Sequence, residues 1–315
     1  MRALVREGSD ATPLSEQGVE IVRGDLVDPA SLEPALDGVD ALVTTAAGYV
    51  RRRKGDSLAA VDDRGNRNLV DAARNAGLGR FVFTSILTCD KATDVPHFWQ
   101  KKLIEDYLEA SGVPFVALRP GAFIGVWDYW KRGLRKGRLM AMGSASVRWT
   151  YVHVDDVARY LAMAVDQPGA DGRRIDVGMD RPVSTQDLAA VFTDILGRDI
   201  TVRGLPWPLL NLLARPVGMF SERVSDMRAM IEYFHTGQYV ADTSAQAEIF
   251  GEVPAVEDTL RRYAADAGLL ATVRNPAADG VMSPGRWFVT LRVEATADPP
   301  TIEGMPMTAG CAACP

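Results

Sequence analysis

The chain has 315 residues, of which 47% are hydrophobic and 24% charged, and its formal net charge is -6. This composition is typical of an ordinary globular protein with one large domain or two small ones, and it argues against a disordered chain. The modest negative charge excludes a sequence-wide basic field for nucleic acid.

Local features narrow the class further. Residues 51–54 form the one basic run, which we interpret as a solvated loop, with a phosphate-binding patch as the alternative. Residues 205–220 are the most apolar region, but prolines and Arg215 interrupt them, so no membrane span is expected. Three cysteines make no disulfide framework, and no signal peptide opens the chain, so we predict a cytoplasmic protein.

Strand-like and helix-like segments alternate along the first 120 residues. Residues 40–45 are almost continuously apolar, which is typical of a strand covered on both faces. The alternation with short joints predicts an α/β fold with a doubly wound parallel sheet. The predicted strands are 3–5, 19–22, 40–45, 80–85 and 115–119, and the predicted helices are 28–36, 56–75, 97–111, 184–196 and 222–236.

Four fragments carry a family resemblance: "GVEIVRGDLVDPASLEPALDGVDALVTTA", "AVDDRGNRNLVDAARNAGLGRFVFTSIL", "KKLIEDYLEASGVPFVALRPGAF" and "YVHVDDVARYLAMAV". In order and spacing they resemble the NmrA-like branch of the atypical short-chain dehydrogenase/reductase family. The resemblance implies an NAD(P)-binding Rossmann domain at residues 1–180 and a smaller substrate region at 181–270, to which 126–150 contribute. We expect residues 271–315 to be a disordered tail.

Candidate cofactor residues lie at the strand ends, because an open parallel sheet binds ligands beyond the carboxyl ends of its strands. Arg6 stands where the family places the group that meets the adenosine ribose. A guanidinium there pairs with a 2′-phosphate, which favours NADP over NAD; a solvated strand end is the alternative. Asp25 and Leu26 resemble the adenine contact, with a turn residue as the alternative for Asp25. The other candidates are Ala46, Ala47, Gly48, Ser85, Lys101, Pro120, Gly121 and Phe123.

Candidate catalytic residues depart from the usual family pattern, in which a tyrosine stands four residues before a lysine. Lys101 fits the lysine position and is expected to hold the nicotinamide ribose, although Lys102 competes for this role. His97 stands where the tyrosine would be, and an imidazole relays protons near neutral pH; a helix-start or surface role is the alternative. Ser85 matches the family's serine, and either binds a carbonyl oxygen or satisfies a turn.

We consider three other groups of residues as binding or metal sites. Trp127, Tyr129 and Trp130 either stack on an aromatic substrate or belong to the core of the smaller region. We predict no metal site, because Asp155 beside His153 is best explained as a helix N-cap. The Cys311 and Cys314 pair cannot complete a zinc site alone.

The start of the chain raises its own expectation. Only five residues precede Arg6, whereas a dinucleotide-binding sheet has a first strand, a glycine-rich turn and a helix before this position. We expect these elements to be missing, neighbouring strands to be left unpaired, and dinucleotide binding to be weak. The alternating patch 287–293 is expected to add an edge strand or to fold onto a partner.

Two functions follow from the resemblance. The first is an NAD(P)H-dependent reductase acting on a small carbonyl or quinone-like acceptor, with Lys101 placing the ribose and Ser85 or His97 near the acceptor. The second is a non-catalytic dinucleotide sensor that binds a protein partner, which the missing tyrosine favours. A sugar-nucleotide epimerase ranks third, because that chemistry ordinarily uses the tyrosine.

Overall fold

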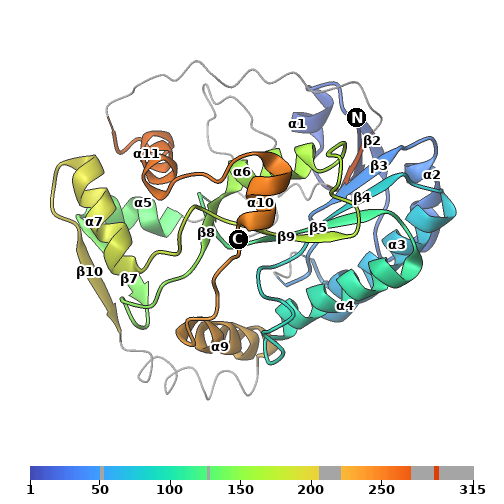
Figure 1. Ribbon diagram of the computed structural model, residues 1–315. Helices are drawn as coiled ribbons and strands as arrows, with labels where there is room; N and C mark the ends of the chain where they lie inside the picture. Colours follow the sequence, from blue (N-terminus) through green and yellow to red (C-terminus); the bar gives the residue numbers. More distant parts are fainter. Residues whose placement is uncertain (50–52, 126–127, 206–220, 271–286, 291–315) are drawn as a thin grey trace.

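The computed structural model describes residues 1–49, 53–125, 128–205, 221–270 and 287–290. Its largest element is a seven-stranded sheet in which all neighbouring strands are parallel (Figure 1). The predicted doubly wound parallel α/β fold is confirmed. In sheet order the strands are β2 (Glu20–Arg23), β1 (Arg2–Val5), β11 (Trp287–Thr290), β3 (Ala41–Thr44), β4 (Arg80–Thr84), β5 (Phe115–Pro120) and β9 (Arg173–Val177).

Both faces of the sheet are covered by helices. On one face Phe81 of β4 belongs to a buried cluster with Leu69 of α3 (Asn66–Asn75) and Ile104 of α4 (Pro96–Ser111). On the other face Val82 belongs to a cluster with Tyr160 of α6 (Val154–Met163). Successive residues of a strand point to opposite faces, so two buried faces explain why these strands are apolar throughout.

The two N-terminal helices that the sequence predicts are broken into shorter pieces. Residues 28–36 form η1 (Pro29–Ser31) and α2 (Glu33–Leu36), and residues 58–75 form the π-helical η2 (Leu58–Gly65) followed by α3. At the second junction the Asn66 amide donates to the carbonyls of Val61 and Asp62, both at 3.1 Å. This side chain adds hydrogen bonds to the carbonyls at the point where the helix type changes.

The central position between β1 and β3 is filled from the far end of the chain. β11 pairs with β1 at Arg2 opposite Phe288, and with β3 from Ala41 opposite Trp287 to Thr44 opposite Thr290. A Rossmann sheet ordinarily has its first strand at this position. The expected unpaired edges of β1 and β3 are therefore wrong, and the expected edge strand is an interior one. Residues 271–286 and 291–315 of the predicted tail lie outside the described residues.

The remaining elements pack beside the sheet around a further buried cluster. Trp130 packs edge-on against Phe192 and Tyr263, with ring centroids 6.1 and 5.9 Å away, so it belongs to this core. Trp127 and the side chain of Tyr129 lie outside the described residues. The elements are β6 (Ala122–Ile124) paired with β8 (Tyr151–His153), β7 (Arg138–Met142) paired with β10 (Thr201–Leu205), and the helices α5 (Asp128–Arg135), α7 (Thr185–Leu196), α9 (Glu222–His235) and α11 (Val256–Asp266).

Two short helices complete the description. α1 (Thr12–Ser15) packs Leu14 against β1, and α10 (Ser244–Phe250) packs Ile249 and Phe250 into the cluster that contains Val82. Within the described ranges, no helix has the length and apolar character needed to cross a bilayer.

Candidate functional site

Helix α4 carries three polar residues on the face that it turns toward the sheet. His97, Lys101 and Glu105 follow one another at intervals of four residues, which places them one above another on a helix. All three are buried, with 6%, 5% and 0% of their surface exposed. Polar side chains this buried must find partners, and their partners define the site.

Lys101 reaches the carboxyl end of β3. Its Nζ donates to the carbonyl oxygen of Ala46 at 3.0 Å and lies 4.8 Å from the centre of the Phe83 ring. The neighbouring Lys102 instead bonds to Asp106, 2.5 Å away on the outer side of α4. Of the two competing lysines, Lys101 is therefore the one that lies at the strand ends, where a parallel sheet binds its ligand.

His97 is held by a carboxylate from a distant part of the chain. Oδ2 of Asp226, on α9, lies 2.5 Å from Nδ1 of His97, and Oδ1 accepts a bond of 3.1 Å from the backbone N–H of His97. The Tyr49 ring stacks on the imidazole with centroids 4.1 Å apart. A surface role for His97 is thereby excluded, and the helix start is capped by Asp226.

Ser85 and Glu105 belong to a buried charge network. The Ser85 hydroxyl donates to Oε1 of Glu105 at 2.5 Å. Arg119 binds both oxygens of Glu105, at 2.9 and 2.6 Å, and Arg174 donates to Oε2 at 3.0 Å. Burial lowers the pKa of Arg119, but the bonds and charge of Glu105 outweigh this effect and raise that pKa. Arg119 therefore keeps its positive charge, and the Ser85 hydroxyl is directed at Glu105.

Cys89 adjoins this network. Its Sγ lies 3.5 Å from Oε1 of Glu105 and 3.6 Å from the Ser85 hydroxyl. Burial, and then the negative charge of Glu105, raise the pKa of the Cys89 thiol to about 12. The thiol is thus protonated at physiological pH.

Arg6 lies just beyond the end of β1 and already binds an anion. Its Nη1 donates to Oδ1 of the buried Asp56 at 2.8 Å, and its Nη2 donates to Oδ2 at 3.4 Å. Arg53, from the basic run, donates to the Glu7 carbonyl and to the Ser9 hydroxyl, both at 2.7 Å. Arg53 is thus held by the turn after β1, and the alternative interpretation of this run, a phosphate-binding patch, stays a prediction. Asp56 marks the place at which Arg6 holds a negative group.

Asp25 and Leu26 occupy a turn after β2. Oδ1 of Asp25 accepts from the Val27 backbone N–H at 3.2 Å, a bond typical of an aspartate that stabilises its own turn. Leu26 is buried in the cluster that contains Phe81, and its carbonyl accepts from Asn68 at 2.9 Å. The structure thus supplies the turn role that was the alternative for Asp25.

The predicted glycines are required by close approach of the protein's own backbone. A Cβ at Gly48 would lie 2.5 Å from the Ser57 carbonyl, and one at Gly121 would lie 2.5 Å from the Thr150 carbonyl. Gly48 also donates to Asp62 at 2.6 Å. Gly48 thus packs against η2, and the expected approach of a cofactor to it stays a prediction.

The other small-residue candidates are partly structural. Ala46 and Ala47 are half-buried in the turn after β3. Pro120 ends β5, and its carbonyl accepts from the Leu87 N–H at 3.1 Å. Phe123 of β6 packs against the cluster that contains Val82. Of this group, only Ala46 has a described bond to Lys101.

His153 forms the N-cap of α6. Its Nδ1 accepts from the Asp155 backbone N–H at 3.3 Å, so the expectation that Asp155 is the N-cap is wrong by two residues. Burial lowers the pKa of His153. One ligand atom each from His153, Asp155 and Asp266 lie within 4.8 Å of one another, but the cap already uses Nδ1.

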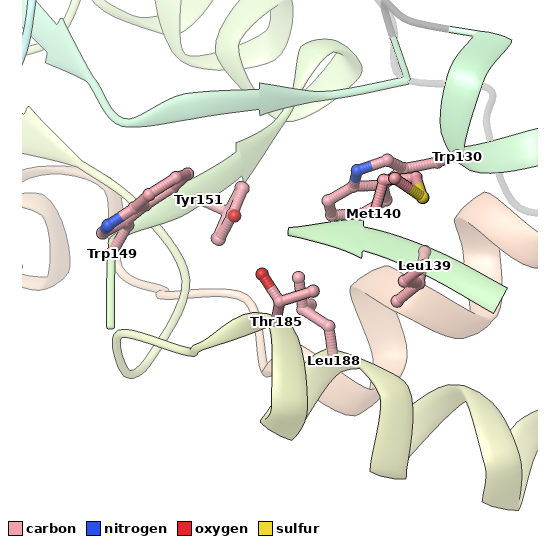
Figure 2. A pocket seen from close by; sticks show the side chains of 7 residues that line it. All are labelled: Trp130, Leu139, Met140, Trp149, Tyr151, Thr185 and Leu188. Carbon is pink, nitrogen blue, oxygen red and sulfur yellow. The ribbon is translucent and has the colours of Figure 1, made fainter. Parts of the chain in front are cut away.

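A pocket lies away from α4, among the elements that pack beside the sheet. Figure 2 shows its lining, with aromatic side chains from α5 and β8 on one side and Thr185 and Leu188 of α7 below. Trp149 packs 4.8 Å from Phe234 of α9, which joins the pocket wall to the helix that carries Asp226. The lining residues are Trp130, Leu139, Met140, Trp149, Tyr151, Thr185 and Leu188.

The structure brings together Ala46, Lys101 and His97, and it places Ser85 and Arg6 in separate contacts. Sequence reasoning missed Asp226 and Asp56 as partners. Asp226 is 129 positions from His97, and nothing in a helix pattern marks it as a partner. Asp56 was available as the first acidic residue after the basic run, although no spacing links it to Arg6.

The fold and this cluster define a Rossmann-type α/β protein with a polar site at the carboxyl ends of its strands. Residues 1–257 match the model of the NmrA-like family, and the chain belongs to this family. The resemblance seen in the four fragments is thereby confirmed.

Known proteins of several kinds are similar to the chain. A photosystem II assembly factor, Ycf39 of Trieres chinensis, is 26% identical over 235 residues, covering 74% of this chain and 73% of that protein. An NAD(P)H azoreductase of Xenophilus azovorans is 27% identical over 203 residues, covering 63% and 66%. The NADPH complex of the quinone oxidoreductase QOR2 of Escherichia coli has a TM-score of 0.65 at 22% identity, covering 83% and 90%. This structural likeness shows the fold alone.

Proposed function

We propose that the chain is an NAD(P)H-dependent reductase that acts on a small carbonyl or quinone-like acceptor, with NADP as its favoured cofactor. The observation that carries this proposal is the buried pair His97 and Lys101 at the carboxyl end of β3. The names of two similar proteins, an NAD(P)H azoreductase and an NADPH-dependent quinone oxidoreductase, support the same class of reaction.

The described residues fit a dinucleotide at two points. Arg6 holds the carboxylate of Asp56, a contact that supports an anion-binding role for the guanidinium, such as binding a 2′-phosphate. The two bonds to Asp56 use two of the five N–H donors of Arg6. At the other end, Lys101 lies beside the Ala46 carbonyl, where its ammonium would meet ribose hydroxyls.

Different residues of the chain would have different roles in the reduction. A bound reduced nicotinamide supplies the hydride. Lys101 would orient the ribose through a charge-assisted hydrogen bond, and His97 would give a proton to the acceptor oxygen. The rings of the half-buried Tyr49 and the buried Phe98 limit water around the imidazole. The predicted role of Ser85 stays a prediction, since its hydroxyl proton is committed to Glu105.

The test is NADPH consumption by the purified chain with a panel of quinones and small carbonyl compounds. Lys101→Met should abolish most of the turnover, whereas Lys102→Met should retain it, because the adjacent lysine bonds to Asp106 on the outer side of α4. Equal melting temperatures of the two variants would exclude a general folding defect. Equal turnover by both variants would remove Lys101 from the site.

Cofactor preference tests the adenosine end. Arg6→Gln should weaken NADPH binding by about tenfold or more relative to NADH, because it removes a charged partner of the 2′-phosphate. Asp56→Asn should act in the opposite direction, because it removes an anion that competes for the same guanidinium. Calorimetric titration of both dinucleotides measures the ratio, and an unchanged ratio in both variants would contradict the assignment of Arg6.

A second candidate is a non-catalytic dinucleotide-binding protein that acts through a protein partner. It is favoured by the histidine at position 97 in place of the family's tyrosine, and by similarity to a protein named as an assembly factor. NADPH binding without consumption of NADPH by any acceptor would support this candidate over the reductase.

A further inference from the structure

We propose that Asp226 is the positioning residue of His97: it fixes the imidazole with a proton on Nδ1, so that Nε2 is the nitrogen presented to the acceptor. This inference rests on the proposed reductase. It assigns to α9, a helix outside the NAD(P)-binding sheet, a direct part in placing the proton donor.

The geometry around Nδ1 carries the proposal. Nδ1 of His97 and Oδ2 of Asp226 lie 2.5 Å apart, with only 7% and 5% of their side chains exposed. Within the described part of the chain, both atoms are buried without any other hydrogen-bond partner of good geometry, so each is the other's one close polar contact. Two buried polar atoms this close stabilise each other by sharing a proton, and a carboxylate can only accept. The proton therefore lies on Nδ1.

The carboxylate is itself fixed at the start of α4. The N-cap residue Val95 offers no side-chain acceptor, and Oδ1 of Asp226 takes this role by accepting from the His97 N–H at 3.1 Å. The positive end of the helix dipole favours a negative group there. Figure 1 shows α9 lying beside the beginning of α4, in agreement with this bond.

The ring plane is also determined. Tyr49 stacks on the imidazole at an interplanar angle of 22°, and the Phe98 ring meets it edge-on with centroids 4.7 Å apart. With its face covered and Nδ1 committed, the imidazole has one nitrogen left for chemistry. A base oriented by a second group is the arrangement that proton-transfer sites commonly use.

The proposed role of His97 is to transfer a proton from Nε2 to the acceptor oxygen. With reduced nicotinamide bound, the acceptor carbon would gain a hydride with two electrons and leave oxidised nicotinamide, and the acceptor oxygen would gain the proton of Nε2 from protonated His97. The N–H bond at Nε2 breaks and an O–H bond forms. His97 is left neutral with its proton on Nδ1, bonded to Asp226, and solvent returns the proton to Nε2 before the next cycle.

The first measurement is the imidazole tautomer by ¹H–¹⁵N correlation spectra of histidine-labelled protein. The chain has only three histidines, so His97→Gln assigns the signal directly. In mildly alkaline buffer the wild-type spectrum should show the Nδ1–H form of His97. Asp226→Asn should lose this form, and Asp226→Glu, which keeps a carboxylate, should retain it. An Nε2–H form in the wild type would overturn the proposal, even if the asparagine variant failed to fold.

The second measurement separates positioning from stability. Asp226→Asn should lower kcat by about 10- to 100-fold and leave KM for NADPH unchanged, because Lys101 and Arg6 hold the cofactor. The matched control is Glu232→Gln, an exposed position on the same helix, which should change neither. Unchanged kcat in folded Asp226→Asn would overturn the inference. A wild type inactive with every acceptor would contradict the reductase itself, and the tautomer would still decide whether Asp226 positions His97.

Discussion

The inner face of α4 contacts two buried carboxylates, Glu105 toward its C-terminal end and Asp226 at its start. The two carboxylates differ in how many groups bond to them. At the end nearer the C-terminus of the helix, Glu105 receives bonds from Ser85, Arg119 and Arg174. At the helix start, Asp226 has two described partners, the ring and the backbone N–H of a single residue, His97. Lys101 lies between the two ends.

This difference separates structure from chemistry. The oxygens of a carboxylate that bonds to three charged or hydroxyl partners are not available to bond to another group during a reaction. Such a network makes the core rigid. A carboxylate bonded to one titratable ring lets that ring gain or lose a proton at its other nitrogen. We infer that the Glu105 end holds α4 against the sheet, whereas the His97 end is the reactive one.

The largest expected effect comes from breaking the Glu105 end. Glu105→Ala removes the common acceptor of the buried Arg119 and the partly exposed Arg174, and we expect the free energy of unfolding to fall by about 3–5 kcal/mol. Urea denaturation followed by circular dichroism measures this loss. The matched control is Glu109→Ala, one turn further along α4, where the carboxylate is 66% exposed and also bonds to Arg174.

The control should lose less than about 1 kcal/mol, as exposed ion pairs usually do. Comparable losses in the two variants would mean that burial of Glu105 does not set the energy of the network, and the contrast between the two ends of α4 would lose its basis.

Ser85 gives an intermediate effect that sharpens the comparison. Ser85→Ala removes one bond to a charged group, so we expect a stability loss of about 1.5 kcal/mol and turnover close to that of the wild type. His97→Gln should instead lower turnover by about 10²–10⁴-fold, measured on the folded fraction because this variant also leaves the buried Asp226 without its partner. Steady-state kinetics with the best acceptor decides the matter. A severe loss of kcat in folded Ser85→Ala would indicate that the hydroxyl contacts the substrate.

Much of the fold followed from sequence pattern. The five predicted strands are confirmed because each is a short apolar run closed by a turn, and the spacing of His97, Lys101 and Glu105 on one helix face follows from helical periodicity alone. The position of β11 did not follow. Residues 287–290 alternate as an edge strand would, and only the pairing partners on both sides place them in the centre of the sheet.

The sequence predicted which residues lie near the strand ends, but it did not predict the side chains that bond to them. The place of Lys101 on the inner face of α4 followed from its spacing, but the sequence could not show that Ser85 bonds to Glu105 or that Arg6 bonds to Asp56. These partners are 20 and 50 positions away, and charge pairing over such separations depends on the packed fold. The local rules that predict helices and turns carry no information about it.

The smallest expected effect concerns Cys89, which we expect not to react with an alkylating reagent in the native chain. With its pKa raised to about 12 by burial and then by Glu105, roughly one thiol in ten thousand is ionised at pH 8, and only the thiolate reacts. Iodoacetamide should therefore leave Cys89 unmodified in the native chain and alkylate it in denaturant. Mass spectrometry of the tryptic peptide 81–91 reads this cysteine apart from Cys311 and Cys314. Equal alkylation in both states would show that solvent enters the Glu105 network, and that this end of α4 is no more closed than the His97 end.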